Sequence, residues 1–158
     1  MHTLNLKQEL DGSDLKIAII RSRFNEDVTQ ALLDGALAGL ADSKVGTDDI
    51  RVFTVPGAFE ISLAAKKVAL TGEFDVVICL GVVIKGDTPY FDYISQAVTA
   101  GIVQVNLETE IPVIFGILTT LTLEQAQDRT KNDKTNRGYE AALCAIEMVK
   151  TCQEIEEI

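Results

Sequence analysis

The sequence contains a single histidine, His2, and no pair of cysteines separated by two residues. A structural zinc site normally needs several such ligands at short spacing, so a zinc protein is not expected. With histidine only at position 2, a Ser-His-Asp or Cys-His mechanism within one chain is excluded unless the N-terminus takes part. The three cysteines, Cys79, Cys144 and Cys152, are odd in number and widely spaced. This pattern predicts buried free thiols in a cytoplasmic protein.

No stretch of the chain approaches the roughly 20 apolar residues that a membrane-spanning helix needs. Residues 1–14 are polar and mixed in charge, so they do not predict a signal peptide. The formal net charge of −10 argues against nucleic acid and anionic membranes as partners. An anionic substrate would therefore have to meet a local basic cluster.

The composition is that of an ordinary globular protein. Hydrophobic residues make up 47% and charged residues 24% of the 158 positions, which argues against disorder. The length predicts one domain over 1–158, with an N-terminal extension at 1–14 and a solvated acidic tail at 153–158. No internal repeat, low-complexity run or linker interrupts it.

Segments of strand and helix type alternate four times along the chain. The predicted strands are 16–20, 50–55, 75–84 and 112–119. The predicted helices follow Asn25, cover 58–70 and 91–108, and begin again at a capping-box pattern (122–125) and at Asn136 or Gly138. Residues 21–25 are expected to form a polar turn, with Asn25 as the helix N-cap. This order predicts an α/β fold with a mostly parallel sheet, helices on both faces, and ligands beyond the carboxyl ends of the strands.

Unusual residues accompany all four predicted strand ends. They are Arg23, Phe24 and Asn25, then Gly57, Ala58, Phe59 and Glu60, then Lys85, Gly86, Asp87, Thr88 and Tyr90, and finally Phe115, Thr119, Thr120 and Arg129. Taken singly, each has an ordinary explanation, such as a helix staple for Phe24 or a surface charge for Arg129. Together, aromatic faces, a carboxylate, backbone amides and a guanidinium suit a small aromatic, polyhydroxylated or phosphorylated ligand.

The segment from Gly81 to Tyr93 is the most informative of these. Its apolar run ends at a Gly-Asp-Thr-Pro turn, and a helical pattern follows. Backbone N–H groups and the helix dipole favour an anion at such a position. Spacing alone therefore indicates an anion-binding α/β protein with an enzymatic function.

Several short motifs also occur in a fixed order. They are SRFN (22–25), VPGAFEI (55–61), GVVIKGDT (81–88), FDY (91–93), PVIFG (112–116), LTT (118–120), EQA (124–126), DR (128–129) and NRG (136–138). The ordered set, over about residues 16–150, resembles the 6,7-dimethyl-8-ribityllumazine synthases, which act at the penultimate step of riboflavin synthesis. No single motif is decisive, but the combination is specific.

The resemblance implies a flavodoxin-like three-layer sandwich with a four-stranded parallel sheet, to which an N-terminal strand is added in the oligomer. It implies a cytoplasmic enzyme that condenses 5-amino-6-(D-ribitylamino)uracil with 3,4-dihydroxy-2-butanone 4-phosphate. The lumazine, phosphate and water are released, and no metal or organic cofactor takes part. Pentamers are the family's basic unit, active sites lie between subunits, and riboflavin synthase is a candidate partner. The bend at 128–138 has no insertion of the kind found in members that stop at the pentamer, but its composition leaves an icosahedral shell open.

The resemblance also implies roles for particular residues. Phe24 would stack on the pyrimidine, while Asn25 and the backbone of Val82, Val83 and Ile84 would bind polar atoms of its ring. Ala58, Phe59 and Glu60 would hold the ribityl chain, and Phe115 would close the ring site from a neighbouring subunit. Gly86, Asp87 and Thr88 would hold the phosphate, with Arg129 as a bidentate clamp and Arg137 as a second cation.

Tyr90 departs from the family pattern, which has a proton-shuttling histidine at this position. Tyrosine in model peptides has a pKa of about 10, against about 6.5 for histidine, so it is a poor base at neutral pH. General acid–base help is worth typically 10²–10⁴-fold, but orienting two reactive substrates can supply much of a rate. A working but slower enzyme is therefore expected, with Tyr90 and Arg129 as its catalytic residues.

Two other functions stay open. A paralogue that lost catalysis with the histidine would be a shell protein that binds flavins or ribityl-pyrimidines. The retained Phe24, Glu60, Thr88 and Arg129 favour the enzyme, because a scaffold needs no phosphate clamp. A flavodoxin-like signalling domain is disfavoured, because the acidic cluster of receiver domains is missing.

Overall fold

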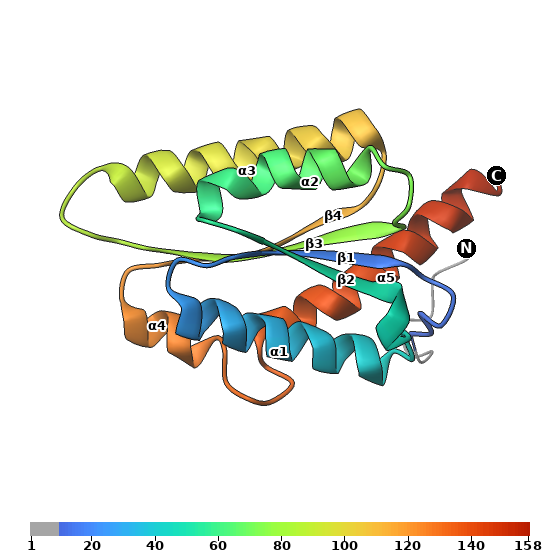
Figure 1. Ribbon diagram of the computed structural model, residues 1–158, viewed down its shortest axis with the longest axis horizontal. Coiled ribbons are helices and arrows are strands. Elements are labelled where there is room, and N and C mark those ends of the chain that lie inside the picture. Colours follow the sequence, from blue (N-terminus) through green and yellow to red (C-terminus); the bar gives the residue numbers. More distant parts are fainter. Residues whose placement is uncertain (1–9) are drawn as a thin grey trace.

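A computed structural model of the chain describes residues 10–158 and shows one parallel sheet between two layers of helices (Figure 1). The elements are β1 (Ile17–Ser22), α1 (Glu26–Asp42), the 3₁₀ turn η1 (Thr47–Asp49), β2 (Ile50–Val55), the 3₁₀ turn η2 (Ala58–Glu60), α2 (Ile61–Ala69), β3 (Val76–Ile84), α3 (Tyr90–Thr109), β4 (Val113–Thr120), α4 (Leu123–Asp128) and α5 (Arg137–Glu156). The predicted α/β class and the alternation of elements are confirmed.

The four strands run in the order β2-β1-β3-β4, and every neighbouring pair is parallel. The central strand β3 is buried along nearly its whole length, as its unbroken apolar sequence predicts for a strand covered on both faces. Because β1 lies between β2 and β3, the chain reverses direction across the sheet after β2. That reversal opens a crevice at the carboxyl ends of β1 and β3, where ligands of such sheets bind.

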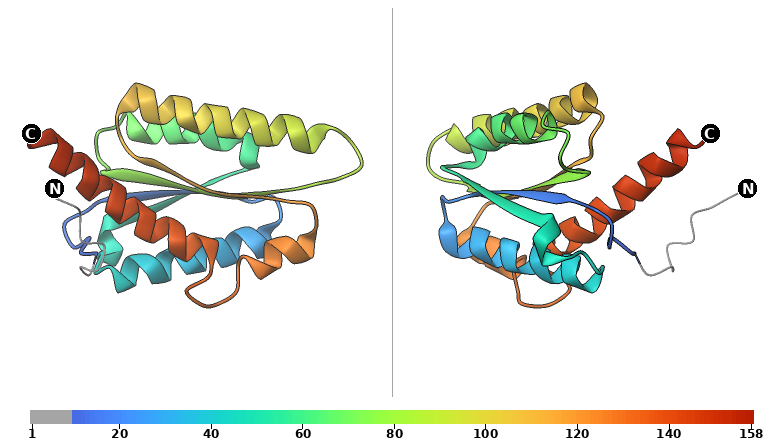
Figure 2. Two further views of the ribbon diagram at one scale, coloured as in Figure 1. Left: turned by 180° about the vertical axis from the view of Figure 1, so that it is seen from behind. Right: turned by 45° about the vertical axis from the view of Figure 1, so that its right-hand side comes forward.

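Two hydrophobic cores lie on the two faces of the sheet. The helices α2 and α3 cover one face, and α1, α4 and α5 cover the other (Figure 1). The i, i+4 spacing of Val28, Leu32, Ala36 and Leu40 predicts the inward stripe of α1, and all four are buried against the face that α1 covers. The last turns of α5 continue past the edge of the sheet, as both views in Figure 2 show.

The predicted bounds of the turn at 21–25 and of the tail at 153–158 differ from the structure. The predicted turn at 21–25 starts too early, because Arg21 and Ser22 belong to β1 and are buried. Arg21 can be buried because its guanidinium donates to Gln30 Oε1 of α1 at 2.8 Å, a partner that local sequence does not reveal. The predicted acidic tail is exposed, but α5 continues through it as far as Glu156.

Two helix starts were anticipated by their capping residues. The hydroxyl of Thr122 accepts a hydrogen bond from Gln125 N at 3.2 Å, and the amide oxygen of Asn136 accepts one from Gly138 N at 2.8 Å. Asn25 does precede α1, but it adopts left-handed backbone angles and its side chain makes no capping hydrogen bond. The predicted N-cap position of Asn25 is therefore confirmed, but capping by its side chain is not found.

The family resemblance implies an N-terminal strand, and residues 1–9 of the predicted extension at 1–14 lie outside the described residues, as does His2. From Leu10 onward the chain contacts the body of the protein, and Gly12 N donates to Ser43 O at 2.7 Å. None of the helices within 10–158 is both long and apolar enough to cross a membrane.

Candidate active site

A cavity of about 460 Å³ lies at the carboxyl ends of the strands, on the side of the sheet that α2 and α3 cover. Its walls come from the segments that follow β1, β2 and β3, together with the first turns of α3. The lining residues are Phe24, Asn25, Pro56, Gly57, Ala58, Glu60, Val82, Val83, Ile84, Gly86, Thr88, Tyr90, Phe91 and Ile94. The fold thus brings together half of the residues singled out at the predicted strand ends, among them Phe24, Glu60 and Thr88.

The segment after β1 presents an aromatic ring at the mouth of this cavity. The backbone N–H groups of Arg23 and Phe24 donate to Val55 O at 2.9 Å and to Pro56 O at 3.1 Å, which fixes the segment to the end of β2. Asn25 follows with φ 57° and ψ 55° and turns the chain sharply into α1. The Phe24 side chain stays 70% exposed, so its face is available for a planar ligand.

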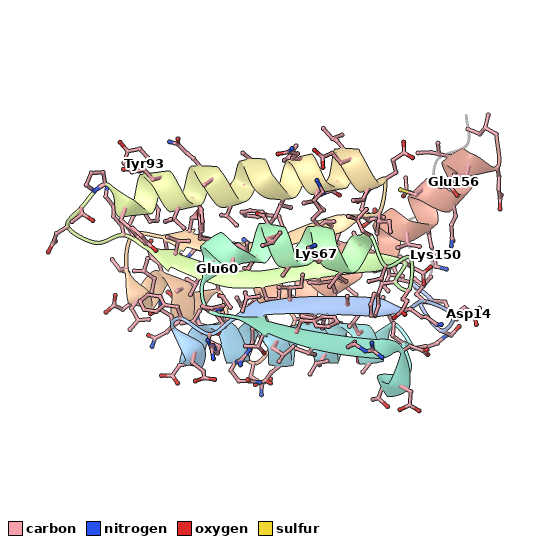
Figure 3. All side chains as sticks on the ribbon, turned by 45° about the horizontal axis from the view of Figure 1, so that its top comes forward. Asp14, Glu60, Lys67, Tyr93, Lys150 and Glu156 are labelled. Atoms are coloured by element: carbon pink, nitrogen blue, oxygen red, sulfur yellow. The ribbon has the colours of Figure 1, made fainter. Side chains whose placement is uncertain are left out.

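The segment after β2 places a carboxylate beside that aromatic. Gly57 N donates to the Glu60 carboxylate at 2.9 Å, which orients the side chain at the start of α2. Ala58 is buried at the base of the cavity, whereas Phe59 is exposed and does not line it. Figure 3 shows Glu60 at the same end of the molecule as Tyr93 of α3. A Glu60 oxygen that Gly57 leaves free can accept hydrogen bonds from hydroxyl groups.

The loop between β3 and α3 has the features of an anion site. The backbone N–H groups of Gly86, Asp87 and Thr88 make no hydrogen bond to any other residue in the range 10–158. A Cβ atom at Gly86 would meet nothing within 4 Å, so the loop is open on that side. Thr88 Oγ1 accepts a long bond of 3.4 Å from Tyr90 N, the first residue of the 20-residue helix α3. Free N–H groups and a helix N-terminus together suit a phosphate.

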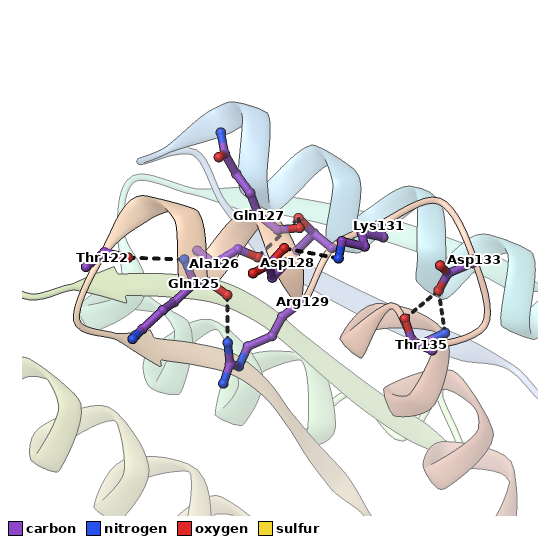
Figure 4. A network of polar contacts seen from close by, with 10 residues as sticks. Thr122, Gln125, Ala126, Gln127, Asp128, Arg129, Lys131, Asp133 and Thr135 are labelled. Carbon is purple, nitrogen blue, oxygen red and sulfur yellow. Dashed lines mark hydrogen bonds and ion pairs between the residues drawn. The ribbon is translucent and has the colours of Figure 1, made fainter.

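Five residues predicted for the site do not line this cavity in the single chain, namely Phe59, Asp87, Phe115, Arg129 and Arg137. Arg129 ends α4 and its guanidinium donates to Gln125 O at 2.8 Å (Figure 4). Phe115 and Arg137 line a second hollow of about 330 Å³ between the edge strand β4 and α5. Phe115 is 42% exposed there, and Arg137 pairs with Glu140. Asp87 belongs to the β3–α3 loop but does not line the cavity.

Comparison with known proteins gives a consistent assignment. The family model described as 6,7-dimethyl-8-ribityllumazine synthase matches residues 14–153. The chain belongs to this family. Among its curated relatives, the 6,7-dimethyl-8-ribityllumazine synthase of Protochlamydia amoebophila (strain UWE25) is 48% identical over 149 residues, which cover 94% of this chain and 87% of the relative.

The cavity of the single chain carries a negative charge and no positive one. Glu60 is the only lining residue that carries a formal charge at neutral pH, and the other walls are largely apolar. A phosphate bound at the β3–α3 loop would therefore gain its cationic partner from outside the lining. Arg129 and Arg137 are the cations that the family resemblance assigns to this task, and in one chain both are exposed.

Some lining residues of the family site were not singled out from sequence. The i, i+4 spacing of Ile94, Val98 and Ile102 predicts a buried stripe on this helix, and Phe91 is predicted to start it. The first turns of α3 lie at the end of the sheet, so Phe91 and Ile94 line the cavity while they also pack against the core on this face. An apolar helix stripe that is longer than the strand beneath it is the signal that could have revealed them.

The thiols do not contribute to the cavity. Cys79 is buried in β3, and burial raises the pKa of its thiol far above the ordinary value. Cys144 is exposed on α5, so the prediction that it is buried is wrong for the single chain. Within 10–158, His, Cys, Asp and Glu side chains form no group of three that could hold a metal ion.

Proposed function

We propose that this protein is a 6,7-dimethyl-8-ribityllumazine synthase of riboflavin biosynthesis. It condenses 5-amino-6-(D-ribitylamino)uracil with 3,4-dihydroxy-2-butanone 4-phosphate, and releases phosphate and water. The observation that carries this assignment is the cavity, which combines an exposed aromatic ring, a carboxylate and an open anion loop within a family member. No protein-bound cofactor is needed, because the amine and the ketone are themselves reactive.

The pyrimidine and its ribityl chain fit the part of the cavity between β1 and β2. Phe24 offers its ring face, and the freed amide of Asn25 together with the backbone of 82–84 offers donors and acceptors for the pyrimidine. Glu60 lies where it can accept hydrogen bonds from the ribityl hydroxyls. Ala58 forms the floor, and the exposed Phe59 lies outside the lining.

The sugar phosphate fits the β3–α3 end, where Gly86, Asp87 and Thr88 have free N–H groups. Its ketone then lies near Tyr90 and near the amine of the first substrate. Attack by the amine forms a Schiff base with loss of one water, and phosphate is then eliminated to leave an enol that becomes a ketone. The ribitylamino nitrogen attacks this carbonyl and closes the ring with loss of a second water. Holding both substrates in one cavity supplies an effective concentration that can reach about 10⁵ M or more. Tyr90 donates a hydrogen bond or proton during these steps.

The complete site is formed between subunits. Phe115, Arg129 and Arg137 lie outside the cavity of their own chain, on or near the β4 edge of the sheet. In a pentamer that packs this edge against the next chain's cavity, Phe115 closes the ring site and Arg129 clamps the phosphate. The protein acts as this pentamer in the cytoplasm, alone or within an icosahedral shell, and riboflavin synthase uses its product.

A steady-state assay with both substrates, followed by lumazine absorbance and corrected for the uncatalysed reaction, tests the assignment. Turnover above background is expected for the native protein. Replacing Tyr90 by histidine should raise kcat, by up to about 10²-fold, because an imidazole shuttles protons at neutral pH. Tyr93→His is the matched control, since Tyr93 is 71% exposed on the same helix and does not line the cavity.

The outcomes separate the two functions. Activity only in Tyr90→His would mean that the native chain is a catalytically weakened paralogue with an intact binding cavity. No turnover by either the native protein or Tyr90→His would contradict the synthase assignment.

A further inference from the structure

The side chain of Asn136 is buried where the loop 129–137 meets α1. It is 2% exposed, and it is the only buried residue of this loop. Its amide nitrogen donates to Ala31 O of α1 at 3.0 Å and to Lys131 O across the loop at 3.1 Å. Its amide oxygen accepts from Gly138 N at 2.8 Å. One side chain thus joins α1, the loop and the start of α5.

The Asn136 amide and the start of α5 pack closely against α1 at two glycine positions, Gly35 and Gly138. A Cβ atom at Gly35 of α1 would lie 2.2 Å from Asn136 Oδ1, so a glycine is required opposite the amide. A Cβ atom at Gly138 would lie 1.9 Å from Leu32 O, so the start of α5 also touches the backbone of α1. The position of Asn136 relative to α1 is therefore fixed by contact as well as by hydrogen bonds.

The two candidate arginines, Arg129 and Arg137, are the first and last residues of this loop. Arg137 N donates to Arg129 O at 2.8 Å, which closes the loop next to Asn136. The other side-chain contacts across the loop, Asp128 with Lys131 and Asp133 with Thr135 (Figure 4) and Lys134 with Asp42 of α1, are exposed. The Thr130 hydroxyl bonds only locally, to Ala126 O at the end of α4. Exposed contacts of this kind contribute little rigidity, so the buried amide dominates the placement of the loop.

We propose that Asn136 is a positioning residue for phosphate recognition: it fixes the loop 129–137 on α1 and thereby sets where the Arg129 and Arg137 guanidinium groups emerge. This inference rests on the proposed function, in which these arginines meet the phosphate of the second substrate. Asn136 itself does not touch substrate. Its effect is confined to the substrate that carries phosphate.

The substitution Asn136→Asp separates the bond that caps α5 from the two bonds that hold the loop on α1. The aspartate keeps an oxygen for Gly138 N, but it replaces the amide donor by an oxygen that faces Ala31 O and Lys131 O. We expect the KM for the sugar phosphate to rise about 10-fold or more, since small misplacement of a binding group is costly. The KM for the pyrimidine substrate should stay unchanged, because the two arginines are proposed to contact only the phosphate. A partial loss of folded protein would lower the measured activity but would change neither KM.

Asn106→Asp is the matched control. Asn106 donates to Ile102 O at 3.0 Å and to Val113 O at 2.9 Å, and it accepts from Val113 N at 2.8 Å. It therefore makes the same set of bonds near the start of β4, at the opposite end of the strands from the cavity. A similar loss of stability without the selective KM increase is expected.

A second pair of variants guards against misfolding of Asn136→Asp. Gly35→Ala pushes on the Asn136 amide and leaves the amide itself intact, so it should show the same selective KM increase. Gly39→Ala crowds the same helix contact one turn further along, where its Cβ would lie 2.9 Å from Tyr139 O and from Ala142 Cβ. It should not show the KM split.

Hydrogen exchange gives a measurement that needs no activity. The Arg137 amide should exchange faster in Asn136→Asp than in the native protein or in Asn106→Asp. Unchanged exchange would overturn the inference. Parallel increases of both KM values, or equal effects in Asn106→Asp, would also overturn it. If the native protein gave no turnover, the proposed function would fail and hydrogen exchange alone would decide whether Asn136 fixes the loop.

Discussion

Asn25 shows how one residue can serve the fold and the site through its backbone. It lies between β1 and α1 with φ 57° and ψ 55°, where residues with a Cβ atom are strained and asparagine is tolerated better than most. This conformation removes its side chain from the helix end, so the amide makes no capping bond and lines the cavity instead. The sequence indicated the helix start but not the backbone angle.

The Asn25 backbone angle leads to a stability prediction. Asn25→Ala should lower the free energy of unfolding by about 1 kcal/mol, since alanine has no local interaction that offsets the left-handed angles. Asn25→Gly should lose less, because glycine adopts these angles freely. Urea titration of the two variants measures the difference. Equal losses would mean that the side chain, and not the backbone angle, carries the stability.

Cys144 is a residue that the sequence predicts to be buried and that the structure shows to be exposed. Its position among apolar residues of a helix predicted burial, yet it faces the hollow at the β4 edge and is exposed. Partial burial and the nearby Glu147 raise the pKa of its thiol. Hydrophobic periodicity places a residue near an apolar face, but only the packing of α5 against the edge strand decides whether another element covers it.

At the scale of elements, the contact between α1 and α5 organises the lower layer of helices. Small residues, namely Gly35 and Gly39 on α1 and Gly138 and Ala142 on α5, bring the two backbones close together. A polar contact reinforces this crossing at one end, where the Tyr139 hydroxyl donates to Asp42 Oδ2 at 2.7 Å. Lys134 of the 129–137 loop lies 3.7 Å from the same carboxylate.

Tyr139→Phe tests the worth of this contact between elements. The hydrogen bond to Asp42 raises the pKa of Tyr139, so the folded state favours the neutral phenol. Its stabilisation is therefore complete below about pH 10, the ordinary value, and is lost as pH rises through the higher folded-state pKa. The variant should unfold about 1 kcal/mol more easily at pH 7.

The pH dependence is the sharper part of this prediction. The difference between native protein and Tyr139→Phe should narrow above pH 10, as measured by urea unfolding at several pH values. Tyr93→Phe, at an exposed position, is the control and should change little at any pH. A difference that stays constant across pH would show that Tyr139 acts through packing alone.

At the scale of the whole molecule, the two halves of the proposed site lie on different parts of the surface. The cavity is built from β1, β2 and β3, while Phe115 is exposed at the edge strand β4. An exposed aromatic on an unpaired edge strand is a feature that proteins normally cover. Assembly through this edge would cover Phe115 and complete the site of a neighbouring chain.

Phe115→Asp should therefore reduce the assembly and leave the fold of the chain intact. Sedimentation velocity is expected to show a large native particle and much smaller species for the variant, with an unchanged circular dichroism spectrum. Leu37→Asp is the control, because Leu37 is similarly exposed at 36% but lies on α1. A native particle no larger than the 17.2 kDa chain would contradict the pentamer.

The sequence by itself determined the order of strands and helices, the parallel sheet, and most of the cavity lining. These features depend on local apolar patterns and on the rule that parallel strands end at one edge, so Phe24, Glu60 and Thr88 could be placed together beforehand. Only the tertiary structure decided the burial of Arg21, the backbone angle of Asn25, and the fixing of Asn136 on α1. Arg21 and Asn136 are buried because packing brings hydrogen-bond partners on α1 alongside them, and the angle of Asn25 is set by the turn between β1 and α1. Local sequence patterns do not encode these placements.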